Sequence, residues 1–443
     1  MNLNKTLVDT FNSYCVVYDN INILSLSQVY VFELSQRRMD NSLLGLIKKL
    51  SLENYVKYIF FFFIKEQNIA KTKYLFINDI FNASMISNMR SVQNQFDVPF
   101  KEIITDKRLL SDYSKFIYKY LSVLSYLAAL PKYLKVLINS RKTIIALANE
   151  FKISPTLLSL NLLDTLFVLC TVKGLLKKEN HTKNIILNTD VHKISRAIVL
   201  QARTNNIRTF VIQHGSTVLE YGYLPVSSDY MLAWGELSSN WFLERDTPLE
   251  KLKVLGTPKM DFLQNFTINK EPHHDEVKNI LIIVNPIGDE NVNIFLRTIL
   301  DSDIHKTFQL TIKLHPSSFD NRDLVEKHFG NTKAIILKNE NTQNLIYETD
   351  VVITSTSTVG NEAIAFFKPL IQISIKNFNI TMDYEIYNCC HKISTSEKLK
   401  KLIGDKGKIY SKLTNYNNFI ENYFYRLDGL ASKRIMDFII SKE

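Results

Sequence analysis

The sequence predicts an α/β protein built from two successive parallel-sheet halves with a cleft between them. From about residue 183 onward, short apolar runs alternate with helix-like stretches, as they do in βαβ units. A polar stretch at 269–278 interrupts the alternation, which then starts again. Three polar loops, at 213–215, 315–318 and 355–358, each follow an apolar run. Because ligands bind outside the carboxyl ends of such strands, these loops predict one active site.

Length and composition predict a multidomain protein with anionic partners. The 443 residues are 46% hydrophobic, enough for two or three domains with their own cores. The net charge of +10 favours nucleotide-activated donors, acidic polymers, nucleic acid or an anionic membrane face, without choosing among them. No nucleic-acid-binding motif accompanies the basic clusters, so we expect no nucleic-acid partner.

The start of the chain and its cysteines predict a cytoplasmic location. The first residues run into polar sequence, unlike a secretory signal. The most apolar stretch, at 58–64, is far below the roughly 18 residues that span a bilayer. We expect a buried strand or helix there, with seating on a membrane as the alternative. The four cysteines form no CxxC pair, which fits a reducing compartment. The inner face of the cytoplasmic membrane stays open as a location.

The predicted elements are clearest after the first 180 residues. Before that point, 121–147 has helical apolar spacing that Pro131 interrupts, and 157–178 predicts an apolar helix beneath a sheet. The first regular half has predicted strands at 184–187, 208–213, within 228–235 and at 251–255, and predicted helices at 193–205 and 238–244. The second half has predicted strands at 279–284, 309–314, 334–337, 351–354 and 370–373.

The end of the chain predicts helices that can dock elsewhere. Residues 410–442 are largely helical and amphipathic in pattern, and Ile435, Phe438 and Ile439 are available to pack. The predicted divisions are an acceptor-side domain at 1–268, a linker at 269–278, a nucleotide-binding domain at 279–415 and a C-terminal helix at 416–443.

His214 is the strongest candidate for catalysis. It follows a strand and precedes Gly215, whose missing side chain lets a ligand approach closely. A neutral imidazole near pH 7 is a suitable general base for an acceptor hydroxyl. The alternative is a histidine that only satisfies a turn. Asp190, at the end of the neighbouring strand, is expected either to orient this histidine and line the cleft or to cap the following helix. Gln213, Gly215 and Pro286 are expected to line the cleft.

Lys313 and His315 are candidates for donor binding. In a regular strand they share one face, and Pro316 fixes the backbone as it leaves the strand. An imidazole at this place can donate a hydrogen bond to a phosphate or hold a nucleobase. A purely structural histidine is the alternative.

A hydroxyl-rich loop before a predicted helix is a candidate for phosphate binding. Backbone N–H groups and the helix dipole favour an anion at a helix start. Capping needs one hydroxyl, whereas this loop has four: Ser355, Thr356, Ser357 and Thr358. Glu362, in the first turn, is expected to accept hydrogen bonds from ribose hydroxyls, or to be simply an acid favoured by the dipole.

No metal site is expected. Asp301-Ser302-Asp303 matches a loose DxD pattern, but it follows the end of a predicted helix. Cys389-Cys390-His391 lacks metal-ligand spacing. We therefore expect no cofactor, with the nucleotide-activated donor acting as substrate.

At these motifs the chain resembles the GT-B glycosyltransferases of bacterial surface-polysaccharide assembly. That group includes capsule enzymes, sialyl- and polysialyltransferases, Kdo transferases and teichoic-acid polyol-phosphate polymerases. The resemblance covers roughly residue 183 to the C-terminus. It rests on an ordered set of short motifs: Val211-Ile212-Gln213-His214-Gly215, Asp229, Trp234-Gly235, Gly256-Thr257-Pro258, Asp261, Lys313-Leu314-His315-Pro316 and the run from Ser355 to Thr358.

The resemblance implies two Rossmann-like domains facing across a cleft, with the nucleotide in the C-terminal domain and the last helix crossing back to the first. It also implies direct displacement at the anomeric carbon without a metal. The HP and paired-serine motifs favour a CMP-linked acidic sugar. The chain lacks the acidic-acidic-glycine motif that supplies the base in bacterial sialyltransferases, which leaves His214 in that role. The implied donor contacts are His315, Ser355, Thr356, Ser357 and Glu362.

The predicted function is that of an inverting glycosyltransferase that uses a CMP-, CDP- or UDP-linked donor. Its expected acceptor is a glycan or lipid-linked glycan of capsule or lipopolysaccharide, with peripheral membrane contact allowed. The alternatives are a polyol-phosphate transferase on the same fold, a sugar-nucleotide epimerase and a non-catalytic subunit that binds nucleotide or glycan. An epimerase would need carboxylates near the sugar ring, and the sequence alone does not place any.

Overall fold

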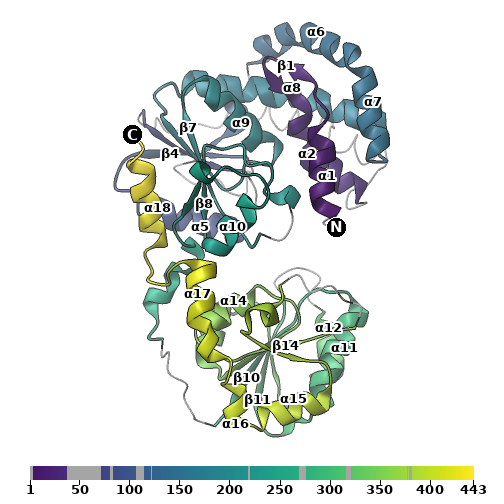
Figure 1. Cartoon of the computed structure of the whole chain (residues 1–443), viewed down its shortest axis with the longest axis vertical. Coiled ribbons are helices and arrows are strands. Elements are labelled where there is room, and N and C mark those ends of the chain that lie inside the picture. The colour runs from purple at the N-terminus through teal and green to yellow at the C-terminus, as the bar shows by residue number, and fades with distance from the viewer. Residues whose placement is uncertain are drawn as a thin grey trace. The chain divides into compact units, whose positions relative to one another are not determined.

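The computed structural model describes two compact units (Figure 1). The first unit comprises Met1–Lys259 with Ser432–Glu443, and the second comprises Met260–Ala431. The described residues are 3–36, 71–79, 83–105, 114–120, 122–217, 220–268, 276–315, 321–376, 378 and 382–443. The apolar stretch 58–64, most of the predicted linker and the residues that follow His315 lie outside them. The division at Lys259 precedes the predicted linker.

The first unit contains a seven-stranded parallel sheet in the order β5-β4-β3-β6-β7-β8-β9. Central strands such as β6 and β7 are apolar runs because helices cover both faces of a parallel sheet. The predicted strands from residue 184 onward are confirmed, whereas the three earlier strands were not predicted. The bounds are β3 (Tyr74–Asn78), β4 (Phe100–Ile104), β5 (Ser114–Phe116), β6 (Asn184–Leu187), β7 (Arg208–Ile212), β8 (Tyr230–Ala233) and β9 (Leu252–Val254).

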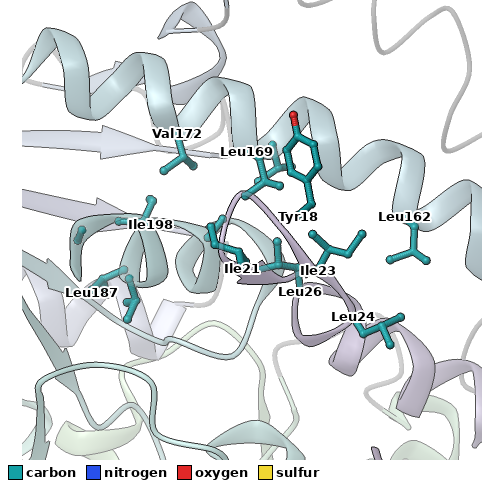
Figure 2. Packing of buried hydrophobic residues seen from close by; sticks show 14 of the residues in the cluster. Tyr18, Ile21, Ile23, Leu24, Leu26, Leu162, Leu169, Val172, Leu187 and Ile198 are labelled. Atoms are coloured by element: carbon teal, nitrogen blue, oxygen red, sulfur yellow. The ribbon is translucent and has the colours of Figure 1, made fainter. Parts of the chain in front are cut away.

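The larger core of the first unit joins the start of the chain to the sheet. Figure 2 shows side chains from a small hairpin and the turn after it, from the long helix α8, and from α9 and β6, meeting in one apolar cluster. Ile23 and Leu24 are completely buried there. The helices and hairpin strands are α1 (Leu3–Asn12), β1 (Val17–Tyr18), β2 (Ile21–Asn22), α2 (Gln28–Ser35), α5 (Ala83–Gln93), α6 (Val123–Asn139), α7 (Arg141–Glu150), α8 (Pro155–Lys178), α9 (Lys193–Thr204) and α10 (Glu236–Leu243).

The predicted interruption at Pro131 is wrong, because α6 runs through this residue and ends at Asn139. The next helix, α7, begins at Arg141 after a break at Ser140. Proline removes one N–H and frees the carbonyl four residues earlier, here that of Leu127. Pro131 is exposed and Leu127 is 55% exposed, so water can satisfy the freed carbonyl.

The long helix α8 is apolar enough, by length and composition, to cross a membrane, but 56% of its most apolar window is buried by the rest of the protein. Ser154 caps its start by accepting a hydrogen bond from the Leu157 N–H. The helix packs against α6, α7 and α9. This helix corresponds to the predicted apolar helix at 157–178 and begins slightly earlier, at Pro155. Most of its buried apolar side chains belong to the core of the first unit.

The second unit contains a six-stranded parallel sheet in the order β12-β11-β10-β13-β14-β15. Five of these strands were predicted and the edge strand β15 was not. The strands are β10 (Asn279–Ile283), β11 (Gln309–Lys313), β12 (Ile335–Leu337), β13 (Val351–Thr354), β14 (Leu370–Ile373) and β15 (His391–Ile393). The helices are α11 (Asp289–Leu300), α12 (Arg322–Phe329), α13 (Thr342–Glu348), α14 (Val359–Ala365), α15 (Ser396–Ile403), α16 (Lys406–Ile409) and α17 (Tyr416–Phe424).

The last helix, α18 (Ala431–Ile440), returns to the first unit, as predicted. Its Ile435 and Ile439 are completely buried in a cluster with Tyr74, Phe76 and other sheet residues. The preceding helix α17 stays in the second unit. The predicted C-terminal segment at 416–443 therefore divides between the two units.

Candidate functional site

Asn188 and His214 lie just beyond the carboxyl ends of two neighbouring strands of the first unit. β6 and β7 pair in parallel, with Leu187 opposite Val211, so the loops that follow them leave the sheet at one edge. The two residues are linked, because His214 makes a hydrogen bond with the backbone of Asn188. The open edge of this sheet is where the fold class places ligands.

Tyr223 holds the His214 loop in place. Its hydroxyl accepts a hydrogen bond from the Gly215 N–H at 2.9 Å and donates one to the Gly215 carbonyl at 2.6 Å. Its ring stacks on the His214 imidazole, with 4.7 Å between centroids and 14° between planes. The imidazole is therefore fixed on one face by an aromatic ring.

The surroundings of His214 keep its imidazole uncharged at neutral pH. Burial and, to a smaller extent, the nearby His192 lower its pKa to about 4, while the hydrogen bond with Asn188 opposes this shift. The ring is therefore uncharged at pH 7. Among the described residues its Nδ1 is buried without a hydrogen-bond partner. A buried nitrogen in this state is unfavourable for stability unless a ligand uses it.

Asn188 was not predicted as a site residue. It is 2% exposed, and neither its amide nitrogen nor its amide oxygen has a hydrogen-bond partner among the described residues. An amide with both ends open can orient a hydroxyl by donating and accepting. The available signal was the polar run Asn188-Thr189-Asp190 directly after an apolar strand.

Asp190 holds a neighbouring loop through hydrogen bonds to its backbone. Its carboxylate accepts hydrogen bonds from the backbone N–H groups of Ser227 and Ser228, at 2.7 and 2.8 Å. Its carbonyl accepts one from Nε of the buried Arg196 at 2.9 Å. The N-cap of α9 is His192, so the capping role is not taken by Asp190. The geometry makes Asp190 a positioning residue for the loop at 225–228, and its catalytic role stays a prediction.

Gln213 braces the loop and is completely buried, and its predicted cleft-lining role stays a prediction. Its amide nitrogen donates to the Gly215 carbonyl at 2.8 Å and to the Ser238 hydroxyl at 3.0 Å. Its amide oxygen accepts from the Trp234 N–H at 2.8 Å. Gln213 and Trp234 therefore fix the ends of β7 and β8 together. Gly215 is partly exposed in this loop.

In the second unit, Lys313 and His315 end β11. Lys313 is buried, and its ammonium donates to the carbonyls of Leu314 and Lys338. Burial lowers the pKa of Lys313, although the charge of Glu340 opposes the shift. His315 is half-buried, and burial and the Lys313 charge lower its pKa. His315 is thus neutral at pH 7, while Lys313 chiefly braces the strand ends.

The loop of four hydroxyl residues after β13 is held by its neighbours. Asn285, after β10, accepts hydrogen bonds from the hydroxyls of Thr354 at 3.0 Å and Ser355 at 3.5 Å. The Ser357 hydroxyl accepts one from the Val359 N–H at 3.2 Å. Two of the four hydroxyls therefore serve the loop itself. Thr356 is half-buried, Thr358 is exposed, and Pro286 is exposed next to Asn285.

Two buried side chains fix the backbone of the same loop. Gln372 donates to the Ser355 carbonyl at 2.9 Å, and Tyr384 donates to the Ser357 carbonyl at 2.9 Å. Gly360 lies against the Tyr384 ring, where an added Cβ would come within 2.5 Å of ring carbons. Glu362 is 5% exposed, so the structure places it beneath the loop, and its predicted ribose contact stays a prediction.

Within the described ranges, no group of three or more His, Cys, Asp or Glu side chains could hold a metal ion. Cys389 and Cys390 are buried in the second unit, and burial raises the pKa of both thiols to about 12. Asp303 follows α11 and pairs with Lys306 and Lys400. Asp303 of the loose DxD pattern therefore takes part in surface ion pairs.

The fold defines a class: two Rossmann-like units, each with a parallel sheet, in a GT-B-like chain. Solved structures of similar fold are a UDP-GlcNAc 2-epimerase from Neisseria meningitidis bound to UDP-GlcNAc, MnaA from S. aureus with UDP, and a UDP-GlcNAc 2-epimerase from Methanocaldococcus jannaschii. Their TM-scores are 0.52, 0.52 and 0.51, at 17%, 15% and 15% identity. Each comparison covers 84% of this chain and 100%, 96% and 100% of the other chain.

These similarities show the fold alone, because the sequence identities are low. No family model matches the chain, and no curated protein matches it. The predicted two-domain α/β fold is thus confirmed. The narrower resemblance to sialyl-, Kdo- and polyol-phosphate transferases gains no support from these structures.

Proposed function

We propose that the protein is a nucleotide-sugar-dependent glycosyltransferase with its base in the first unit and its donor-nucleotide site in the second. The observation that carries the proposal is the pairing of His214 and Asn188 at one sheet edge. Both present buried hydrogen-bonding atoms that have no partner among the described residues. Buried polar atoms without partners need an explanation, and a ligand that completes their hydrogen bonds at a functional site is one.

In the proposed reaction, the acceptor hydroxyl donates its proton to Nδ1 of His214. Its oxygen then attacks the anomeric carbon of the donor sugar, and the bond from that carbon to the nucleotide phosphate oxygen breaks with inversion. The Asn188 amide orients the attacking hydroxyl. A positioned general base of this kind contributes typically 10²–10⁴-fold to the rate. A pKa of about 4 keeps the His214 imidazole uncharged at neutral pH, so one ring nitrogen carries a lone pair.

The donor nucleotide is assigned to the ends of β10, β11 and β13 in the second unit. His315 and the hydroxyl-rich loop supply neutral donors, and the loop backbone is fixed by Gln372 and Tyr384. A preformed loop binds phosphate without first losing conformational freedom. The sequence motifs favour a CMP-linked acidic sugar, while two of the similar solved structures contain UDP or UDP-GlcNAc. The donors to be tested therefore include both cytidine- and uridine-linked sugars.

The second candidate is a sugar-nucleotide epimerase, because the similar solved structures include UDP-GlcNAc 2-epimerases. Such chemistry needs acid and base groups at the sugar ring. In the first unit, the Asp79 carboxylate is taken by the N–H and hydroxyl of Ser195, and the Asp190 carboxylate by two backbone N–H groups. The Oδ2 atom of each of these two strand-end carboxylates is therefore engaged in holding the fold, which favours the transferase.

The test is turnover of CMP-, CDP-, UDP- and GDP-linked donors by the full chain, with and without a surface-glycan acceptor. A transferase releases nucleotide only with an acceptor, and His214→Ala abolishes the release. An epimerase instead incorporates solvent deuterium into the sugar without an acceptor. A polyol-phosphate transferase leaves phosphorus in the product. Nucleotide binding without turnover would identify a binding subunit and refute the proposal.

The acceptor and the setting follow from the same proposal. A glycan or lipid-linked glycan of capsule or lipopolysaccharide is the expected acceptor, handled in the cytoplasm. Direct displacement in this scheme uses no metal, and the nucleotide sugar is a substrate, so no resident cofactor is invoked.

A further inference from the structure

Helix α6 carries an apolar stripe on its outer face. Leu124 is 81% exposed, Leu127 55%, Leu134 39% and Ile138 71%. These side chains, with the exposed Pro131, recur every three or four residues and so lie on one side of the helix. Scattered exposed leucines are ordinary, but a continuous stripe of them marks an interaction surface.

The opposite side of α6 is the one that packs on the first unit. Tyr133 is completely buried, and its hydroxyl donates to the Leu162 carbonyl of α8 at 2.6 Å. Tyr126, Ala129 and Leu130 pack against the same core. Helix α6 therefore has two apolar surfaces: one packs on the core, and the other, the stripe, is exposed. A helix that is apolar on both sides is expected where protein covers one side and another apolar phase covers the other.

The surroundings of the stripe are basic. Lys132 and Lys135 lie within α6, and Arg141 and Lys142 begin α7. No Asp or Glu occurs between residues 122 and 149. A helix that combines apolar and cationic side chains without acids is typical of segments that lie in the interface of an anionic membrane.

A cavity beside α6 extends the basic surface. It has a volume of about 750 Å³ and is lined by Ser122, Ser125 and Ala129 together with Lys173, Lys177 and Lys178 of α8. Lys173 pairs with Asp19, and the Lys178 ammonium lies 5.6 Å from the Tyr120 ring centroid. Phosphate headgroups suit such a set of ammonium groups next to an apolar helix.

We propose that α6 docks the first unit on an anionic lipid surface, with the stripe from Leu124 to Ile138 entering the apolar boundary and the neighbouring lysines meeting phosphate headgroups. We choose lipid over a second copy of the chain because of charge. An identical copy would place the same Lys and Arg side chains opposite those around the stripe, and like charges repel. The proposal is independent of the proposed function, because neither His214 nor the loop after β13 takes part.

The experiment is flotation of the full chain with vesicles of phosphatidylcholine containing phosphatidylglycerol, and with vesicles of phosphatidylcholine alone. We expect binding to the anionic vesicles that falls at least about 10-fold in Leu127→Glu/Leu134→Glu and in Lys132→Glu/Lys135→Glu. The matched control is Leu249→Glu, also in the first unit, where Leu249 is 65% exposed. It should bind like the wild type. Thermal unfolding checks that every variant is folded.

Two results would overturn the proposal. One is vesicle binding that is the same in the wild type and in both double variants. The other is a wild-type dimer in light scattering that becomes a monomer in Leu127→Glu/Leu134→Glu without any vesicle binding, which would make the stripe a contact between copies. A fluorophore on Leu124→Cys adds a direct readout, because its emission should shift only when anionic vesicles are added. A shifted emission in their absence would show that protein already covers the stripe.

Discussion

Both sheet edges hold a loop by its backbone, and the first edge also keeps buried polar side-chain atoms without described partners at the strand ends. In the first unit, His214 and Asn188 keep buried atoms without partners among the described residues. In the second unit, the carbonyls of Ser355 and Ser357 receive hydrogen bonds from Gln372 and Tyr384. The atoms of His214 and Asn188 that have no described partner at the first edge reduce the stability of the fold. At the second edge, Gln372 and Tyr384 use their hydrogen bonds to hold the loop rigid.

The difference indicates separate tasks. Proton transfer needs an atom that is free to react and is held in the correct place. Phosphate binding needs a loop whose shape is set before the ligand arrives. Both edges use a tyrosine that holds loop backbone, Tyr223 at the first and Tyr384 at the second, and Tyr223 also stacks on His214.

The largest effect is expected from His214→Gln, which removes the proposed base at the first edge. Turnover should fall by about 10²–10⁴-fold, the range for loss of a positioned general base. Nucleotide affinity should stay near the wild-type value, because the nucleotide is assigned to the second unit. Steady-state nucleotide release measures the first quantity, and the exposed His181→Gln serves as the control. Unchanged turnover would show that His214 is not the base and would contradict the separate roles proposed for the two edges.

Gly360→Ala should disturb the second edge without touching the first. The new Cβ would meet the Tyr384 ring at 2.5 Å, and the buried ring has no room to move. Overpacking of this kind costs about 1–3 kcal/mol of unfolding free energy, and nucleotide affinity should fall with it. Chemical denaturation and nucleotide titration test both. The control is Gly222→Ala, where the added Cβ meets nothing within 4 Å.

Acid should destabilise the folded protein because His214, at the first edge, binds a proton more tightly in the unfolded chain. The pKa of His214 is about 4 in the folded chain and near 6.5 when unfolded, so protons bind the unfolded state preferentially between these values. The stabilising contribution is complete above pH 6.5 and is lost as the pH falls toward 4. Allowing for the exposed part of the residue, we expect a loss of about 1–2 kcal/mol. Urea unfolding of wild type and His214→Gln across this range measures it, and equal slopes would contradict the assignment.

Asn188→Leu should give the smallest change in stability and a clear change in activity. The substitution removes two buried polar atoms that have no described partner and keeps a similar volume. Stability should therefore stay the same or rise by about 1 kcal/mol, while turnover falls. Asn285→Leu is the matched change at the second edge, where the amide oxygen accepts two hydroxyls, and it should destabilise. A loss of stability in Asn188→Leu would show that the amide has a structural role.

The sequence predicted the strands of the first sheet from β6 onward and missed β3, β4 and β5, which lie before residue 180. β6, β7 and β13 are mainly apolar and are followed by polar loops, which is the pattern of a central parallel strand. β4 contains Lys101 and Glu102, both buried. Lys101 pairs with Glu179 and Glu102 with Arg90, partners that are distant in the chain or on another element. Such pairing cannot be inferred from local periodicity.

The candidate site was predictable in position and not in detail. Short motifs placed His214, His315 and the hydroxyl-rich loop at strand ends, and the structure has them there. Which polar atoms are already used depends on contacts from elsewhere in the fold. Asp190 is engaged by Ser227 and Ser228, and no pattern near Asp190 indicates this. Asn188 was missed because an asparagine after a strand is usually only a turn residue.

The most direct test of the division between the two edges is calorimetric titration of CMP and UDP into wild type, His214→Gln and His315→Ala. We predict that one nucleotide binds wild type and His214→Gln with the same affinity, and that His315→Ala weakens it at least about 10-fold, as loss of a buried hydrogen bond to a charged phosphate would. Weakened binding in His214→Gln with normal binding in His315→Ala would place the nucleotide in the first unit and contradict the account.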